Sequence, residues 1–231
     1  MRVLVIDTAL NLCTVGVVEV VDGAVRPLGL RSLEMAKGHQ ERLAGLARDA
    51  VGETDGGFGA IDRIGVTVGP GSFTGLRVGL AFAHGLGAAL DRPVVGLSTL
   101  DALAASADGA ATDSVGALID ARRGQVYARF WSDGVPTGPA EALALEAAAA
   151  RVEALAPGAR LIGSGAALVA ANRPDIETIE AVGPAPEALA RLTAAADLAA
   201  GPAQPLYLRA PDATPPTRLP GQARPTRIPG A

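Results

Sequence analysis

The feature that most constrains the fold is a row of small residues spaced four apart in the first half of the chain. Gly71, Gly75, Gly79, Ala83 and Gly87 follow this spacing, and no proline occurs from residue 73 to residue 90. At this spacing they lie in one stripe along a helix. Glycine inside a helix costs about 1 kcal/mol relative to alanine, so such a helix needs close packing against a neighbour. We expect that neighbour to be the chain's own sheet, with another subunit as the alternative.

The segments on either side of this helix have the pattern of strands. Apolar residues at 64, 66 and 68 alternate with small ones, which indicates a strand with a buried face, and a short apolar strand follows at 94–97. Pro93 and the residues before it end the helix, and Ser72 is predicted to cap its beginning. Strand, helix and strand predict a parallel βαβ unit with a right-handed crossover.

The remainder of the first half predicts three strands and two more helices. Residues 3–6, 14–20 and 25–30 read as a meander, and apolar positions at i, i+3, i+4 and i+7 predict a helix over His39–Val51. Ser98 with Asp101 has the spacing of a capping box, which predicts another helix start. The expected order of elements is therefore βββαβαβα.

The second half is less regular. Segments 115–119 and 125–131 read as a hairpin whose turn holds Asp120 and Arg122, which could pair with each other or contact a partner. Helices are predicted at 141–155 and 187–198, and a strand at 160–162. Six prolines after residue 210 and no apolar period predict a disordered tail, whose arginines could meet RNA phosphate or simply be solvated. The expected divisions are an N-terminal subdomain over 1–107, a reduced subdomain over 108–209 and a proline-rich tail over 210–231.

Composition excludes several classes of function. The net charge of −4 gives no electrostatic footprint for nucleic acid bound by this chain alone. Cys13 is the only cysteine, and His39 and His84 are the only histidines, so we predict no disulfide, no metal site and no other cofactor. Both histidines are expected on helix surfaces. No uninterrupted apolar run reaches the length of a membrane span and no secretory leader is visible, so we expect the cytoplasm.

Several segments together resemble the bacterial TsaB (YeaZ) family. They occur in order from residue 2 to about residue 209 and read VLVIDTA, GHQERL, VGPGSFTGLRVGLAFAHGLG, VVGLSTLDALA, IDARRGQVYA and PLYLR. The resemblance implies an α/β chain of two ASKHA (actin-like, hexokinase-like) subdomains of the βββαβαβα type, the second reduced. It also implies a non-catalytic partner of TsaD in the machinery that makes threonylcarbamoyladenosine beside the tRNA anticodon. In that family the partner dimerises with TsaD through its first two helices, TsaE joins the pair, and tRNA is met indirectly through the complex.

The two matching helices here are His39–Val51 and Phe73–Leu90, and their spacing suggests which residues form the interface. We expect the partner interface to contain His39, Leu43, Leu46, Ala47, Phe73, Leu76, Arg77, Leu80 and His84. Because the second helix is apolar on more than one side, the isolated chain could also form a homodimer.

Two other functions compete with this reading. Asp7 and Thr8 at the end of the first strand are similar to the first phosphate loop of ASKHA kinases, and Gly69, Gly71 and Ser72 precede a helix that could attract an anion. The usual glycines of that first loop and the P-loop lysine are missing, so a vestigial nucleotide loop is the expectation and a small ATP-binding protein or ATPase is the alternative. A peptidase would need a base beside Ser72 or Thr74, and nothing local in the sequence offers one.

Overall fold

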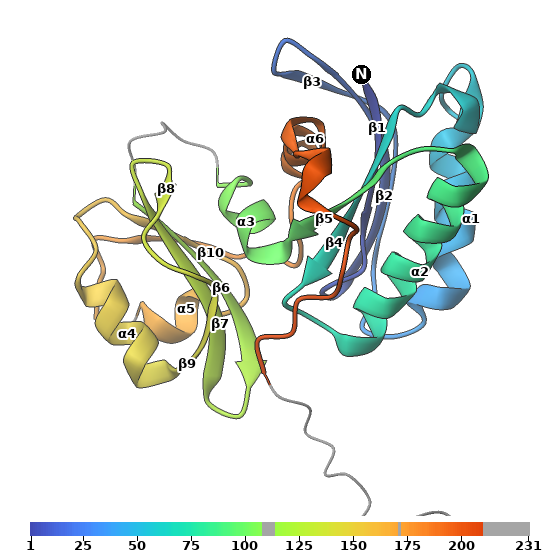
Figure 1. Ribbon diagram of the computed structural model, residues 1–231. Coiled ribbons are helices and arrows are strands. Elements are labelled where there is room, and N and C mark those ends of the chain that lie inside the picture. The colour runs from blue at the N-terminus through green and yellow to red at the C-terminus, as the bar shows by residue number, and fades with distance from the viewer. Residues whose placement is uncertain (108–113, 171, 210–231) are drawn as a thin grey trace, which may run out of the picture.

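The computed structural model describes residues 1–107, 114–170 and 172–209. Two mixed sheets lie side by side, each with helices, and the described chain ends between them (Figure 1). Residues 108–113, at the start of the predicted reduced subdomain, and the predicted tail at 210–231 lie outside the described residues.

The first sheet confirms the predicted meander and βαβ unit. Its strands are β1 (Arg2–Asp7), β2 (Leu12–Val21), β3 (Ala24–Glu34), β4 (Arg63–Gly69) and β5 (Val94–Ser98). Their spatial order is β3-β2-β1-β4-β5. The pairs β3–β2 and β2–β1 are antiparallel, and the pairs β1–β4 and β4–β5 are parallel. Strand β3 is longer than predicted because its polar end, through Glu34, still pairs with β2.

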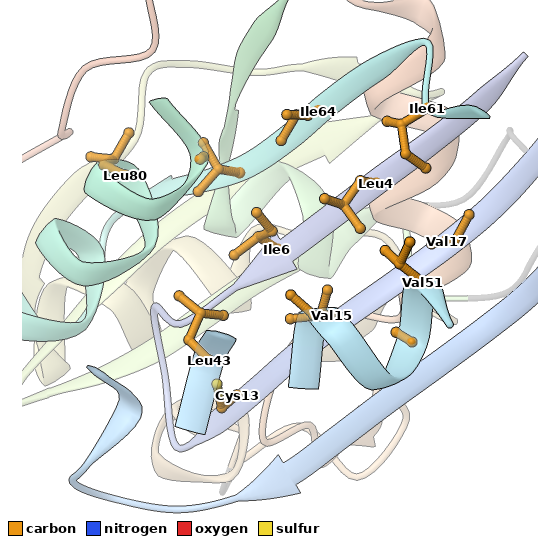
Figure 2. Packing of buried hydrophobic residues seen from close by; sticks show 14 of the residues in the cluster. Leu4, Ile6, Cys13, Val15, Val17, Leu43, Val51, Ile61, Ile64 and Leu80 are labelled. Carbon is orange, nitrogen blue, oxygen red and sulfur yellow. The ribbon is translucent and has the colours of Figure 1, made fainter. Parts of the chain in front are cut away.

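Helices α1 (His39–Val51) and α2 (Phe73–Leu90) cover one face of this sheet, as Figure 1 shows. Their buried residues pack on β1, β2 and β4 in the largest hydrophobic cluster, which contains Leu43, Leu80 and Ile6 (Figure 2). A short 3-10 turn, η1 (Gly57–Ala60), connects α1 to β4.

The second sheet repeats the same plan in smaller form. Its strands are β6 (Val115–Arg122), β7 (Gln125–Ser132), β8 (Val135–Pro136), β9 (Glu141–Ala144), β10 (Arg160–Ile162) and β11 (Glu177–Ile179). Their order is β11-β10-β6-β7-β8, with β9 also paired to β7. Helices α4 (Leu145–Glu153) and α5 (Ala166–Val169) belong to this half and pack in its own hydrophobic cluster.

One helix that follows each sheet in the sequence packs against the other sheet. Helix α3 (Thr99–Ala104) follows the first sheet, but its Leu100 and Leu103 pack with Ile119 of the second. Helix α6 (Pro186–Ala195) follows the second sheet, and it packs on the free face of the first, where Leu189 meets Val3 and Val5. The last part of the predicted range 108–209 therefore packs on the first sheet, and Ala200 of the turn η2 (Leu198–Ala200) lines a hollow with Val68 and Val95 of that sheet.

The remaining differences from the sequence analysis have local causes. The helix predicted over 141–155 begins only at Leu145, because residues 141–144 pair with β7 as strand β9 and this pairing overrides the helical preference of alanine. Helix α6 ends at Ala195, three residues before the predicted end. Strands β8 and β11 and helix α5 were not predicted, since segments of two to four residues carry too little periodicity to be recognised.

Candidate functional site

The stripe of small residues on α2 lies against the chain's own sheet. A Cβ atom added at Gly75 would lie 2.1 Å from the carbonyl oxygen of Thr8, and one at Gly71 would lie 2.2 Å from that of Ala9. At Gly79 it would meet the Thr8 hydroxyl at 2.3 Å. The hydroxyl of Ser72 accepts a hydrogen bond from the backbone N–H of Gly75, as its predicted role as a cap requires. The stripe therefore exists to bring the helix backbone onto the end of β1.

The structure corrects most of the predicted partner face. Leu43, Ala47, Leu76 and Leu80 are buried inside the first half of the chain, and His39 is also buried, at 6% exposure. Their spacing of three and four marks the stripe that faces the sheet, and helical spacing alone does not distinguish a core stripe from a docking stripe. The prediction that both histidines lie on helix surfaces is thus wrong for His39.

The outer surface of the two helices is made of different residues. On α2, Thr74, Ala81, Gly85 and Ala88 are exposed. Beside them, Val78, Phe82 and Leu86 of α2 and Leu46 of α1 are partly buried against the core. We call this surface, with Ala44 and Gly45 of α1, the outer helical face. A Cβ atom added at Gly45 or Gly85 would meet nothing within 4 Å.

Helix α2 also stands out by its composition. Among the described residues it is the single helix that is long and apolar enough to cross a membrane. Only 33% of its residues are buried inside the protein. Core helices pass the same test, and α2 lies along β4 with its glycine stripe on the sheet. What its apolar character indicates is a helix whose inner side is covered while its outer side still presents small and apolar residues.

A second surface lies at the beginning of α2. The guanidinium carbon of Arg77 lies 3.8 Å from the centre of the exposed Phe73 ring, and its Nε donates a 3.2 Å hydrogen bond to the hydroxyl of Tyr207. The rings of Phe73 and Tyr207 are 5.5 Å apart. Arg209 follows two residues later, bonds to Gln125 and lies 5.9 Å from the ring of Tyr127. We call Phe73, Arg77, Tyr127, Tyr207 and Arg209 the aromatic-arginine cluster.

The predicted nucleotide loop is occupied by the chain's own contacts. The hydroxyl of Thr8 donates to the carbonyl oxygen of Gly75 at 2.8 Å, and the backbone N–H of Ser72 donates to the carbonyl oxygen of Ala9 at 2.7 Å. Asp7 is completely buried, and one carboxylate oxygen accepts hydrogen bonds from the Thr67 hydroxyl and the Ala9 N–H. Burial raises the pKa of Asp7 more than these hydrogen bonds and His39 lower it. A phosphate would have to displace these bonds to enter the loop between β1 and α2.

A small hollow remains between the two halves, next to this loop. Its volume is about 270 Å³, and Asn11, Ser72, Tyr127 and Ser164 give it polar groups. Asp120 on its wall pairs with Arg122 at 3.2 Å, which is one of the two roles considered for this turn. Arg122 has a positive φ of 62°, a left-handed conformation that is uncommon for a residue other than glycine.

The described residues offer little for metal or thiol chemistry. Within them, no group of three or more histidine, cysteine, aspartate or glutamate side chains could hold a metal ion. Cys13 is buried, and burial together with the charge of Asp7 raises the pKa of its thiol to about 11. A thiol in this state is a packing residue.

Comparison with known proteins shows which family has this sequence and this fold. Residues 28–201 match the family model of TsaD, tRNA N6-adenosine threonylcarbamoyltransferase. YeaZ from Pseudomonas aeruginosa superposes with a TM-score of 0.72 at 27% identity, covering 90% of this chain and 99% of that one. The chain belongs to the TsaB (YeaZ) branch of the TsaD family. The predicted resemblance and the ASKHA-type α/β fold are thereby confirmed.

Two relatives extend the comparison within the TsaB branch. The tRNA threonylcarbamoyladenosine biosynthesis protein TsaB of Escherichia coli is 36% identical over 131 residues, 55% of this chain and 53% of that protein. An uncharacterized protein of Mycobacterium tuberculosis is 39% identical over 216 residues, 92% of this chain and 94% of that protein. The branch thus contains proteins of threonylcarbamoyladenosine biosynthesis, and the match to the mycobacterial relative spans nearly the whole chain.

The sequence analysis missed residues that only the fold brings together. Tyr207 lies 130 positions from Arg77, and Ser164 and Tyr127 reach the hollow from separate strands and loops. The PLYLR segment was a usable signal for Tyr207, since it was one of the segments that resemble the TsaB family. The small residues of the outer helical face also had a signal, because Ala81, Gly85 and Ala88 lie opposite the buried stripe of α2.

Proposed function

We propose that this TsaB-branch chain is a non-catalytic subunit of the machinery that transfers a threonylcarbamoyl group to N6 of the adenosine next to the tRNA anticodon. It dimerises with the transferase TsaD through α1 and α2, and TsaE joins this pair. The tRNA is reached through the complex, in the cytoplasm, and this chain holds no cofactor. The same helices allow a homodimer when the chain is isolated.

The observation that carries the proposal is the outer helical face. Gly45 and Gly85 weaken their helices, yet nothing in the described chain approaches the side where a Cβ atom would lie. The glycines of the inner stripe are explained by contact with Thr8 and Ala9, whereas these two are not. A partner helix that comes close to this face would use the missing side chains, since small residues let helix backbones approach.

The groups that could catalyse a reaction support a non-catalytic role. The Ser72 hydroxyl accepts from the Gly75 N–H, and Thr8 and Asp7 are held by hydrogen bonds within the fold. Nε2 of His84 lies 2.9 Å from the carbonyl oxygen of Ala203, within hydrogen-bond distance. Among the residues that the structure describes, no hydrogen bond joins the Ser72 hydroxyl to a base, and a serine nucleophile needs such a base.

The test introduces a bulky charge on the outer helical face. Ala81→Arg and Gly85→Arg are expected to abolish capture of purified TsaD while the circular dichroism spectrum stays unchanged, because both side chains point into open space. Ala150→Arg on the exposed side of α4 is the matched control and should capture TsaD as the natural chain does. Normal capture by both variants of α2 would overturn the proposed interface.

Activity and ligand binding distinguish the alternatives. The isolated chain is expected to show no transferase activity, and calorimetry with Mg-ATP should give no binding heat in the micromolar range. Micromolar binding that is lost on replacing Asp7 would favour a nucleotide-binding protein. Cleavage of a protein substrate that disappears in Ser72→Ala would favour a peptidase.

A further inference from the structure

We propose that the aromatic-arginine cluster binds unpaired RNA. The cluster joins three segments that are far apart in the sequence, namely the beginning of α2, the last described residues of the chain and strand β7. In Figure 1 these segments lie together at the end of the molecule where the β6–β7 hairpin turns. This inference rests on the proposed function for the origin of the RNA, and the residues of the cluster are distinct from those of the outer helical face.

The two arginines of the cluster differ from several other surface arginines of this protein. Arg26, Arg31 and Arg151 are each paired with a glutamate within 3.1 Å. Among the described residues, Arg77 and Arg209 have no carboxylate partner, and aromatic rings and neutral oxygens hold them in place instead. Their positive charge is therefore not neutralised by the protein, and phosphate is the anion that guanidinium groups bind in RNA.

The aromatic rings offer faces for stacking. Phe73 is 53% exposed and Tyr207 is 45% exposed, so both keep much of their surface in solvent although they touch each other. Exposed aromatic rings beside arginines are the platforms on which proteins stack unpaired bases. A stem would present its phosphates and not its base faces, so the cluster fits a loop better than a duplex.

Charge along the chain favours RNA over an acidic peptide. The sequence after Arg209 adds Arg218, Arg224 and Arg227 but only one acidic residue, Asp212. This excess of positive charge in the sequence that follows Arg209 favours a polyanion over a short acidic peptide. The overall charge of −4 does not oppose this, because local potential near a charged patch decides binding over a Debye length of about 8 Å.

The experiment measures RNA binding by the full chain, alone and in complex with TsaD. Fluorescence anisotropy would use a labelled RNA stem-loop and, for comparison, the same stem closed as a duplex. Tyr207→Leu and Phe73→Leu are each expected to weaken loop binding about tenfold. Arg77→Gln and Arg209→Gln are each expected to reduce the slope of log affinity against log salt by about 0.7. Arg92→Gln, at the other end of α2, is the control and should leave both quantities unchanged.

The outcomes separate this inference from the proposed function. Loop binding that is lost in the cluster variants while TsaD capture persists supports the cluster as an RNA site. Equal binding by the cluster variants and the natural chain overturns it, as does an equal loss in Arg92→Gln, which would mean binding by general charge. Loss of TsaD capture with unchanged RNA binding would assign the cluster to a protein partner and also overturn it. If the natural chain binds the loop but never captures TsaD, only the proposed function fails.

Discussion

The hydroxyl of Thr8 donates a hydrogen bond of 2.8 Å to the carbonyl oxygen of Gly75. This bond ties the end of β1 to the first turn of α2, and it forms because Gly75 has no side chain to hold the two backbones apart. The contact occupies the loop after β1, where the sequence at Asp7 and Thr8 suggested a vestigial phosphate loop. Because Gly75 has no Cβ atom, the backbone of α2 packs on the end of β1, and this packing occupies the candidate nucleotide loop.

Replacing glycines on the two sides of α2 should have opposite effects. Gly75→Ala places a Cβ atom against the backbone of Thr8 and is expected to lower the free energy of unfolding by about 1–3 kcal/mol. Gly85→Ala meets nothing and should raise it by up to about 1 kcal/mol. Urea unfolding of both variants measures the difference. Equal effects would contradict the packing of the inner stripe.

The buried carboxyl of Asp7 predicts a dependence of stability on pH. Because burial raises its folded pKa, the unfolded chain releases this proton first as pH rises past about 4. The free energy of unfolding should therefore fall until the folded carboxyl also ionises, and then stay lower. Asp7→Asn should remove this part of the fall, which thermal unfolding at pH 4 to 7 would show. Parallel pH profiles for both proteins would argue against a raised pKa.

An ion pair connects the two halves of the molecule. Nη1 of Arg129 on β7 bonds both carboxylate oxygens of Asp101 on α3, at 2.6 and 2.8 Å. Because this pair is partly exposed, a double-mutant cycle with Arg129→Met and Asp101→Asn should give a coupling of only about 1 kcal/mol, which decreases with salt. The cycle for Arg26 and Glu19, within one sheet, is the comparison. In hydrogen exchange, the variant Arg129→Met should show faster exchange of the backbone amides of α3, while the amides of β1 exchange at the same rate as in the natural chain.

Cys13 should resist modification in the folded protein. Its thiol is buried and its pKa is raised to about 11, so the reactive thiolate is scarce at neutral pH. A chromogenic disulfide reagent is expected to react only as fast as the protein unfolds, and addition of urea should release one equivalent. Rapid reaction in buffer alone would show that the α1 side of the sheet opens readily.

The predictions from sequence were most reliable for long elements with strong local signals. The apolar spacing of α1 and α2 and the caps at Ser72 and Ser98 appear in the structure as expected. They depend on residues within one or two turns of each other, so the local sequence contains the information. The strand β9 was mistaken for helix because its pairing partner, β7, lies elsewhere in the sequence.

The residues of the candidate sites were harder to predict. Leu76 and Leu80 were expected at a partner face, and they are buried because their stripe is the one that faces β4. The sequence shows that α2 is apolar on several sides, but it does not say which side the sheet occupies. Only the position of the sheet leaves Ala81 and Gly85 on the outside.

By itself, the sequence determined the order of the elements in the first half, the close packing of α2 through its glycines and membership of the TsaB branch. The tertiary structure decided which helical face stays free, the exchange of α3 and α6 between the halves and the meeting of Phe73 with Tyr207. The reason is physical: spacing along a chain sets which residues share a face, whereas burial and contact depend on what the rest of the chain places against that face.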